Sequence, residues 1–355
     1  MTKHADQPKA WLVRTGSSGD LDEWALENNQ VFIGFDTVGD VAASASRDDV
    51  VAIYMAADPE SNPKAVLNWA AQVWAFAHRI NVGDLAVLPL KRRGQIAIGR
   101  VTADYRYDSA APPERRHSRS VEWIRTDLSR ANVEQDLLYS LGAFLTVCQL
   151  TRHDAARRLL VAADTGVDPG SPAELEGVPD PEPSDATPDV VPQDLAETAR
   201  DTITAFVHKR FAGHAMEGLI ADILTAEGFV CETHGPGTDR GIDIVAGSGP
   251  LGLDSPRLLV QVKSSKEPVG SEAFQQLSGN IADHHGADQG LLVAWGGLTR
   301  QAKELAQPQR FRIRVWTAKD VIDALLNAYP RLPERLRLQV PLSQVWVLED
   351  EDLEG

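Results

Sequence analysis

Two stretches in the second half of the chain decide its fold: GIDIVA at residues 241–246 and LLVQVK at residues 258–263. Both are apolar runs rich in β-branched residues with a few polar side chains, a pattern typical of buried strands. Residues two apart on a strand share one face, so Gln261 and Lys263 point together while the valines beside them point into the core. If the two strands are adjacent, Asp243, Gln261 and Lys263 lie within one small volume.

The segments around these strands alternate between the periodicities of helices and strands. Helices end at glycines and carry an apolar stripe, as the helix expected before Gly228 does. We expect helices at 214–227, 271–284, 299–306 and 318–328, and strands at 229–233, 241–246, 258–263, 290–295 and 311–316. This order predicts an α/β domain, within a chain that is α+β overall, in which helices cover a central mixed sheet.

An acid beside a Gln-x-Lys pair suits phosphodiester hydrolysis. A hard divalent cation such as Mg²⁺ takes oxygen ligands, and one or two carboxylates suffice when water and phosphate complete the shell. Gln261 offers only a neutral amide oxygen, so a further acid is expected to assist Asp243. Glu217 on the preceding helix is the first candidate, and Asp239 is the second. The lysine at 263 would stabilise charge on the phosphate or orient the attacking water.

These motifs resemble the Mrr-like branch of the PD-(D/E)xK nuclease superfamily, over roughly residues 205–330. The resemblance implies a restriction-endonuclease-like fold and DNA cleavage with Mg²⁺ or Mn²⁺. Asp243 then matches the metal-binding acid, Gln261 the second acidic position and Lys263 the catalytic lysine. Glu217 matches the helix glutamate, and Asp239 an acid that often precedes the Gly-Ile-Asp sequence.

The net charge of −16 is concentrated in two segments. Residues 163–199 contain ten acids, seven prolines and no lysine or arginine, and the tail at 341–355 contains five more acids. Setting these fifteen acids aside leaves the rest of the chain near neutrality, so basic patches for DNA remain possible there. We expect an extended linker at 163–199 and a nuclease domain at 200–340.

The N-terminal domain, at residues 9–162, is expected to mix short strands with helices. Helices are expected at 63–80 and 134–150, and a hairpin turns at 91–94. The Trp11-Leu12-Val13-Arg14 strand, the Gly83-Asp84 strand entry and the Ile98-Gly99-Arg100-Val101 return resemble a PUA- or EVE-like domain. That resemblance implies a small β-barrel that recognises modified or flipped bases.

Aromatic and basic residues of this domain are the candidates for DNA binding. A flipped base can stack on an aromatic ring, and arginines in loops can hold phosphates. The candidates are Trp24, Phe35, Trp74, Tyr105, Arg92, Arg93, Arg115, Arg116 and Arg119. Gln275 and Gln276, on the helix that follows Lys263, are further possible DNA contacts.

The sequence therefore predicts a modification-dependent, type IV-like restriction endonuclease. Its expected partner is double-stranded DNA with a modified base, and a homodimer or higher oligomer is expected because one such site cuts one strand. Two alternatives stay open: a non-cleaving nucleic-acid-binding effector, and a nuclease activated by a small ligand. With no membrane span, no secretory leader and two unpaired cysteines, Cys148 and Cys231, we expect a cytoplasmic protein.

Overall fold

The computed structural model describes residues 8–16, 18–143, 145–171, 194–234, 241–283 and 286–346. The chain divides into two compact units, one ending at Thr198 and the other spanning Ala199–Trp346. Each unit has its own sheet and its own core, and each is described by itself. No helix in the described ranges has the length and apolar character that a membrane crossing requires.

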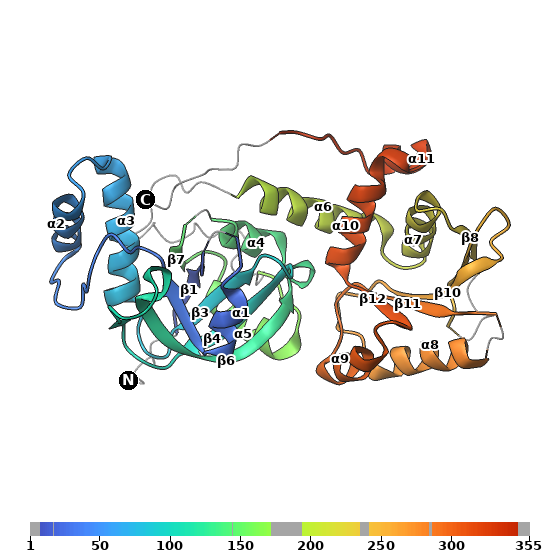
Figure 1. Ribbon diagram of the computed structural model, residues 1–355, viewed down its shortest axis with the longest axis horizontal. Coiled ribbons are helices and arrows are strands. Elements are labelled where there is room, and N and C mark those ends of the chain that lie inside the picture. The colour runs from blue at the N-terminus through green and yellow to red at the C-terminus, as the bar shows by residue number, and fades with distance from the viewer. Residues whose placement is uncertain are drawn as a thin grey trace. The chain divides into compact units, whose positions relative to one another are not determined.

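The N-terminal unit is built on a curled seven-stranded sheet (Figure 1). Its hydrogen-bonded order is β2-β6-β4-β3-β1-β7, with the short β5 also paired to β6. The pairs are antiparallel except β1 with β3, which run parallel. The strands are β1 (Ala10–Val13), β2 (Gln30–Ile33), β3 (Leu85–Leu90), β4 (Gln95–Val101), β5 (Arg106–Tyr107), β6 (His117–Ser129) and β7 (Val147–Leu150). The sheet bends into a half-barrel because the long β6 pairs with β4 along much of its length and with β2 and β5 near its start.

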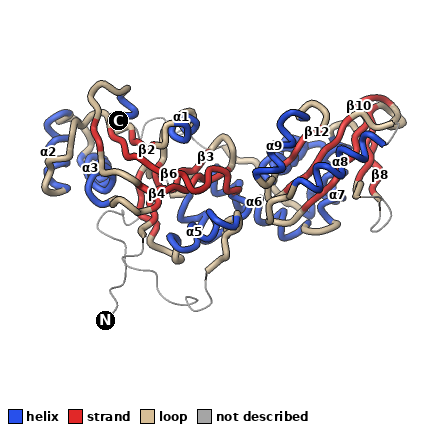
Figure 2. Tube along the Cα trace, turned by 90° about the horizontal axis from the view of Figure 1, so that it is seen from below, coloured by secondary structure: helices blue, strands red, loops and turns tan. Residues whose placement is uncertain are grey.

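Helices complete the core of this unit on both faces of the curled sheet (Figure 2). One apolar cluster joins Trp11 and Phe76 to helices α2 and α3, and another joins Leu12 and Leu85 to helices α4 and α5. The helices are α1 (Asp22–Glu27), α2 (Arg47–Ala57), α3 (Pro63–Trp74), α4 (Gln135–Leu141) and α5 (Ala155–Thr165). Side chains of β1 point alternately to the two faces of the sheet, and each face is covered by one of these clusters. All four residues of β1 are therefore buried.

The sequence prediction was wrong at residues 134–150, where it expected one helix. Helix α4 ends at Leu141, before Gly142, and Val147–Leu150 is strand β7, paired antiparallel with β1. A short apolar run fits either periodicity, and the pairing with β1 decides between them. The expected helix at 63–80 is also divided, because a π-helical turn at Ala75–Arg79 follows α3. Helix α2, which opens with a capping box at Ser46 and Asp49, was not predicted.

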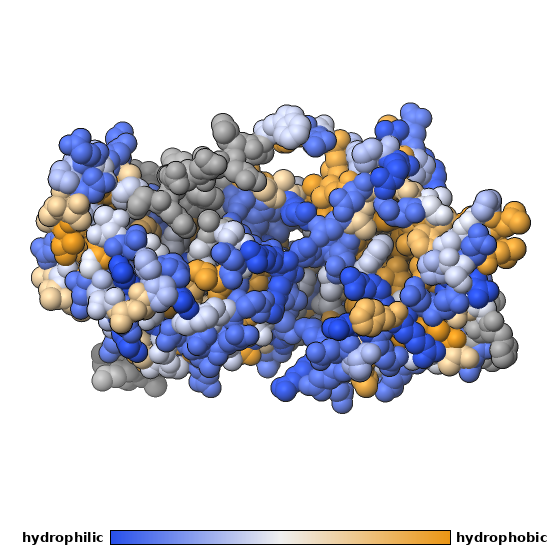
Figure 3. All heavy atoms as spheres, in the orientation of Figure 1, coloured by the Kyte–Doolittle hydropathy of each residue, from blue (hydrophilic) through white to orange (hydrophobic). Residues whose placement is uncertain are grey.

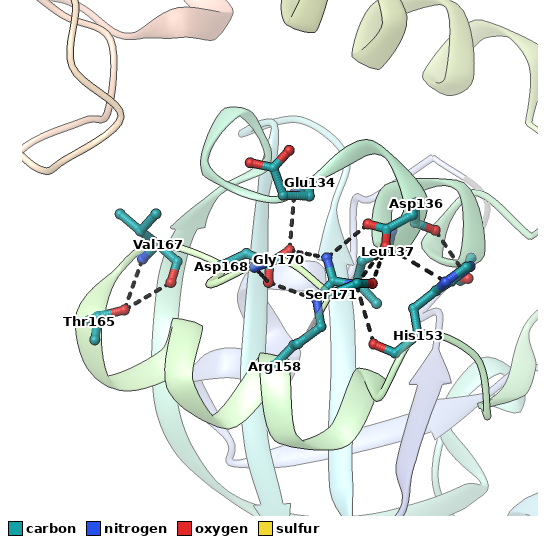
Figure 4. Close-up of polar contacts among 11 residues, drawn as sticks. Glu134, Asp136, Leu137, His153, Arg158, Thr165, Val167, Asp168, Gly170 and Ser171 are labelled. Atoms are coloured by element: carbon teal, nitrogen blue, oxygen red, sulfur yellow. Dashed lines mark hydrogen bonds and ion pairs between the residues drawn. The ribbon is translucent and has the colours of Figure 1, made fainter. Parts of the chain in front are cut away.

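A buried arginine closes the end of the N-terminal unit (Figure 4). Arg158 on α5 is fully buried, and its guanidinium donates to both carboxylate oxygens of Asp168, at 2.9 and 2.7 Å. It donates to both oxygens of Asp136 as well, each at 2.8 Å, and to the hydroxyl of Ser171 at 3.0 Å. Asp168 and Ser171 follow the helix, so this network folds the first residues of the predicted acidic linker back onto the unit.

The last residues of that acidic segment also contact the N-terminal unit. Asp194 lies 3.2 Å from the ammonium of Lys91, and Glu197 lies 3.2 Å from Arg14 and 2.9 Å from Arg130. Residues 172–193 of the predicted linker lie outside the described residues. Both described flanks of the segment are therefore held by cations of one unit, and helix α6 (Leu195–Phe211), which sequence analysis had not assigned, begins there.

The C-terminal unit has a five-stranded mixed sheet in the order β12-β11-β10-β9-β8. Strands β8, β9 and β10 are antiparallel neighbours, whereas β10, β11 and β12 run parallel. Helices α7 and α10 cover one face and α8 and α9 the other (Figure 1). The bounds are α7 (Ala215–Ala226), β8 (Val230–Thr233), β9 (Ile244–Ser248), β10 (Asp254–Lys263), α8 (Ser271–Asp283), β11 (Gln289–Ala294), α9 (Arg300–Ala306), β12 (Ile313–Trp316), α10 (Ala318–Ala328) and α11 (Glu334–Gln339). The predicted fold class and the predicted order of elements are confirmed here, with α11 as an addition.

The two ends of the β9–β10 pair differ in character. The turn that joins the strands exposes Leu251 and Leu253, which are 77% and 72% accessible, and apolar atoms gather at this end of the sheet in Figure 3. At the other end, where β9 begins and β10 ends, stand the polar residues Asp243 and Lys263. The candidate residues Asp243 and Lys263 therefore lie at the end of the strand pair opposite the connecting turn.

Candidate active site

Asp243 is placed by the start of the β9–β10 ladder. Its amide donates to the carbonyl of Val260 at 2.9 Å, and its carboxylate accepts from the amide of Val262 at 2.6 Å. Ile244 pairs directly with Val260, so Asp243 lies one residue beyond the last paired position. The backbone of β10 thus holds this half-buried carboxylate beside Gln261 and Lys263, and the structure brings together the three residues named from their spacing.

Gln261 is completely buried, although it was expected on a polar face of β10. Both faces of the strand are covered, and Leu259, on the same face, packs against Phe274 and Leu277 of α8. The Gln261 amide nitrogen donates to the side-chain oxygen of Gln276 at 3.1 Å. Its carbonyl oxygen has no hydrogen-bond partner among the described residues. Several buried polar atoms of the described residues share this state, and the Gln261 oxygen differs from the others in lying beside Asp243 and Lys263, where a ligand could complete its coordination.

Lys263 is exposed at the last position of β10, and contacts from two neighbours fix its backbone. The amide of Trp295 donates to the Lys263 carbonyl at 2.9 Å. The imidazole of His208 lies 2.9 Å from the next carbonyl, that of Ser264, and its ring packs 5.3 Å from that of Trp295. Sequence analysis missed His208 and Trp295 as supports, because no local pattern shows that α6 reaches the end of β10.

Glu217 stands close enough to Asp243 to influence its ionisation. Burial raises the pKa of the Asp243 carboxyl above its ordinary value, and the charge of Glu217 raises it further. The Val262 amide and the charges of Lys263 and His214 oppose that rise in pKa. Glu217 itself lies 2.8 Å from the imidazole of His214, the residue that directly precedes helix α7. Two acidic side chains in a partly desolvated place favour a bound cation.

The donor set fits a hard divalent cation. Carboxylates at Asp243 and Glu217 and the unpartnered amide oxygen of Gln261 are all oxygen donors, the type that Mg²⁺ and Mn²⁺ prefer. Across the described ranges, no three His, Cys, Asp or Glu side chains form a group that could hold a metal ion. Asp239, the remaining candidate ligand, lies outside the described residues.

The four candidate aromatic residues of the N-terminal unit fall into two groups. Phe35 is part of one buried cluster, against which Trp74 and Tyr105 pack. Trp24 belongs to a different cluster, where it meets Phe32 edge to face at 5.5 Å. Trp74 stacks on His78 of the π-helical turn, with ring centroids 4.0 Å apart. The candidates for stacking a flipped base therefore lie in two separate apolar clusters.

The candidate arginines are also divided. Arg92 and Arg93 are exposed on the β3–β4 turn, and Arg93 pairs with Glu23. Arg115 lies over the ring of Trp24, 4.2 Å from its centroid. Arg119 was expected in a basic loop, and that prediction was wrong. The remaining candidate, Arg116, is half-buried and donates to the carbonyl of Ala111 at 3.4 Å.

Arg119 stands on strand β6 with only 2% of its surface exposed. Its guanidinium donates to the carbonyls of Phe76 and Ala77 at 2.7 and 2.9 Å. Both carbonyls belong to the π-helical turn, whose end leaves backbone acceptors without helical partners. Arg119 therefore holds that turn and is removed from the candidates for phosphate binding.

Comparison with known proteins supports the assignment of the C-terminal unit. Residues 208–325 match the Mrr_cat family model, described as a restriction endonuclease, and residues 11–143 match a domain of unknown function (DUF8426). No curated protein matches the chain. The PUA- or EVE-like character of the N-terminal unit stays a prediction.

Solved structures with some similarity include two restriction enzymes. The DNA modification-dependent restriction endonuclease AspBHI is 13% identical, with a TM-score of 0.32 over 78% of this chain and 72% of its own. The MspJI restriction endonuclease, solved with a 27-mer oligonucleotide, is 15% identical, with a TM-score of 0.32 over 80% and 70%. The protein of unknown function AF1548 is 18% identical, with a TM-score of 0.27 over 35% and 77%.

These structural similarities are low, and the assignment rests on the family match together with the site. The matched range begins at His208 and includes Asp243, Gln261 and Lys263. It also includes the whole of the five-stranded sheet. Residues 208–325 are a restriction endonuclease domain of the Mrr_cat family.

Proposed function

We propose that this chain hydrolyses DNA phosphodiester bonds with a divalent cation, Mg²⁺ or Mn²⁺, at Asp243, Gln261 and Lys263. The observation that carries the proposal is the fully buried Gln261, whose carbonyl oxygen lacks a partner among the described residues. It lies beside a half-buried carboxylate, Asp243, and an exposed lysine. Gln261 does not stabilise the fold in this state, because burying an acceptor without a hydrogen bond costs about 1–3 kcal/mol of folding free energy.

The roles of the residues follow from their chemistry. Asp243, Glu217 and Gln261 supply oxygens to the cation, and Asp239 is a further candidate ligand. A bound cation would polarise the phosphate and lower the pKa of a water ligand. The Lys263 ammonium, with no ion pair in the described ranges, would contact a phosphate oxygen and stabilise charge that develops there. His208 and Trp295 would keep the end of β10 in register during this step.

We further propose that the N-terminal unit reads the DNA and makes cleavage depend on a modified base, as in a type IV-like enzyme. Trp74, His78 and Tyr105 support this reading, since they lie around a π-helical turn at the edge of one core. Such turns occur frequently at functional sites. Stacking on an aromatic ring is worth about 1–3 kcal/mol per base, which offsets part of the cost of flipping.

Double-strand cutting would then need two copies of the chain, since one site of this kind cuts one strand. We propose a homodimer or higher oligomer, at least on DNA. Light scattering of the free and DNA-bound protein tests this point. A monomer in both states that makes double-strand breaks efficiently would contradict it.

The test of the whole proposal is incubation of the purified protein with modified and unmodified plasmid. Cleavage is expected with Mg²⁺ or Mn²⁺, none with a chelator, and a preference for modified DNA. Cleavage of both plasmids at one rate would remove the base-reading role and keep the nuclease. Binding without cleavage under every metal condition would instead favour a non-cleaving nucleic-acid-binding protein.

A further inference from the structure

The amide pair between Gln261 and Gln276 is the starting point. The Gln261 amide nitrogen donates to the Gln276 oxygen at 3.1 Å, from β10 to the neighbouring helix α8. The other end of the Gln261 amide, its oxygen, is buried and has no partner in the described ranges. The two ends of the Gln261 side chain thus differ: its nitrogen donates a hydrogen bond to Gln276, and its oxygen has no partner among the described residues.

Gly241 packs these two amides close to the backbone that leads to Asp243. It has a φ of +84°, and a Cβ built there would lie 2.7 Å from the Gln276 nitrogen and 3.0 Å from the Gln261 nitrogen. Only a glycine leaves room for both groups in this conformation. The amide pair and the segment carrying Asp243 are therefore in direct contact, two residues from the carboxylate.

An amide offers two ends of nearly equal shape and opposite hydrogen-bonding character. A carboxylate at position 261 would present an acceptor oxygen whichever way it turned, whereas glutamine does so in only one of two orientations. In the other orientation, an NH₂ group would face the cation and repel it. A glutamine among metal ligands therefore requires a partner that fixes its orientation.

We propose that Gln276 is a positioning residue that fixes the Gln261 amide and leaves its oxygen free for the divalent cation held with Asp243. This inference rests on the proposed function and assigns Gln276, first considered as a DNA contact, to the site itself. Gln276 does not touch the cation in this scheme. It acts by accepting, with its own side-chain oxygen, the hydrogen bond that the nitrogen end of Gln261 donates.

The experiment exchanges the hydrogen-bonding character of position 276. Gln276→Glu only accepts and should preserve the orientation, whereas Gln276→Lys only donates and should turn the Gln261 nitrogen toward the cation. Gln275, the exposed neighbour on the same helix, provides matched controls for charge through Gln275→Glu and Gln275→Lys. Mn²⁺ binding to the full chain, followed by electron paramagnetic resonance, is the readout. Gln276→Lys should weaken binding about 10–100-fold relative to Gln275→Lys, and Gln276→Glu should bind at least as tightly as Gln275→Glu.

A second set of variants, built on Gln261→Glu, distinguishes an effect on the orientation of the Gln261 amide from general damage to the structure. In Gln261→Glu both ends of the side chain are acceptors, so adding Gln276→Lys should no longer weaken Mn²⁺ binding. Equal binding by Gln276→Lys and Gln275→Lys would overturn the inference alone. So would a loss that persists in the Gln261→Glu background. If the unaltered protein bound no Mn²⁺ and cut no DNA, the proposed metal-dependent function would fall, and this inference with it.

Discussion

Two buried polar sites in this molecule are satisfied to very different degrees. In the N-terminal unit, Arg158 is fully buried and both of its carboxylate partners, Asp136 and Asp168, meet it with two oxygens each (Figure 4). In the nuclease unit, Gln261 is equally buried, but among the described residues only its nitrogen end has a hydrogen-bond partner. Burial and polarity alone therefore do not distinguish the two sites.

The number of unused donors and acceptors does distinguish them. A network in which every polar atom is paired holds the fold together and has nothing left to bind. A buried acceptor without a partner leaves the fold less stable than it could be, and a bound ligand can supply the interaction that it lacks. This contrast predicts that substitutions at the first site change stability, and that substitutions at the second change chemistry.

The largest expected effect is on cleavage by Lys263→Met. Removing one cation that stabilises charge on the phosphate should lower the cleavage rate about 10²–10³-fold. The melting temperature should stay the same, because Lys263 is exposed and makes no ion pair in the described ranges. A plasmid cleavage assay and calorimetry measure the two quantities. Lys64→Met, an exposed lysine on α3, is the control, and a loss of stability in Lys263→Met would break the contrast.

The matching substitution in the N-terminal unit is Arg158→Met. It leaves the carboxylates of Asp136 and Asp168 without their cation, which should cost about 3–5 kcal/mol of unfolding free energy. Chemical denaturation measures this loss. Arg157→Met, the half-exposed neighbour on the same helix, should cost far less. If cleavage by the folded Arg158→Met protein fell as far as in Lys263→Met, the separation of stability from chemistry would be wrong.

The stability difference between the unaltered protein and Arg158→Met should depend on pH. The hydrogen bond from Arg158 holds the pKa of Asp136 well below its ordinary value of 3.8. A lowered pKa in the folded state stabilises the protein above the unfolded pKa, and the benefit is lost as the pH falls through the folded value. The difference in melting temperature between the unaltered protein and Arg158→Met should therefore be largest near neutral pH and narrow below about pH 4. A difference that widens in acid would contradict this account.

The smallest expected effect concerns the exposed Arg92, in contrast to the buried Arg119. If Arg92 contacts a phosphate, Arg92→Ala should reduce the slope of DNA affinity against salt by about 1 and leave stability unchanged. Arg119→Met should instead destabilise the unit, because three backbone carbonyls lose their donor. Fluorescence binding titrations in the non-cleaving Lys263→Met background measure the slope. An unchanged slope in Arg92→Ala would remove Arg92 from the DNA surface.

The sequence predicted the nuclease unit better than the N-terminal unit, for a physical reason. Strands β10 and β11 are parallel and buried on both faces, so their apolar runs are continuous and easily read. The spacing of Asp243, Gln261 and Lys263 followed from the period of a strand. Gln276 could not be assigned in this way, because its contact with Gln261 depends on how α8 packs on the sheet.

In the N-terminal unit, the contacts that decide the structure join residues far apart in sequence. The prediction of a helix across residues 147–150 was wrong because only the pairing with β1 reveals strand β7. The prediction that Arg119 lies in a basic loop was wrong because the carbonyls that its guanidinium contacts lie 42 and 43 positions earlier in the sequence. The ion pair between Lys91 and Asp194 spans 103 positions. Composition can indicate an acidic segment at 163–199 but cannot show where its ends bind.

Those ends have a consequence for engineering the chain. Asp168 binds Arg158 and Asp194 binds Lys91, so the described residues on either side of 172–193 are both anchored to one unit. The entropy of loop closure grows slowly, and each doubling of length costs only about 0.6 kcal/mol. A reporter peptide as long as the segment itself could therefore be inserted there with little loss of stability. The same insertion after Thr198 would interrupt helix α6 instead.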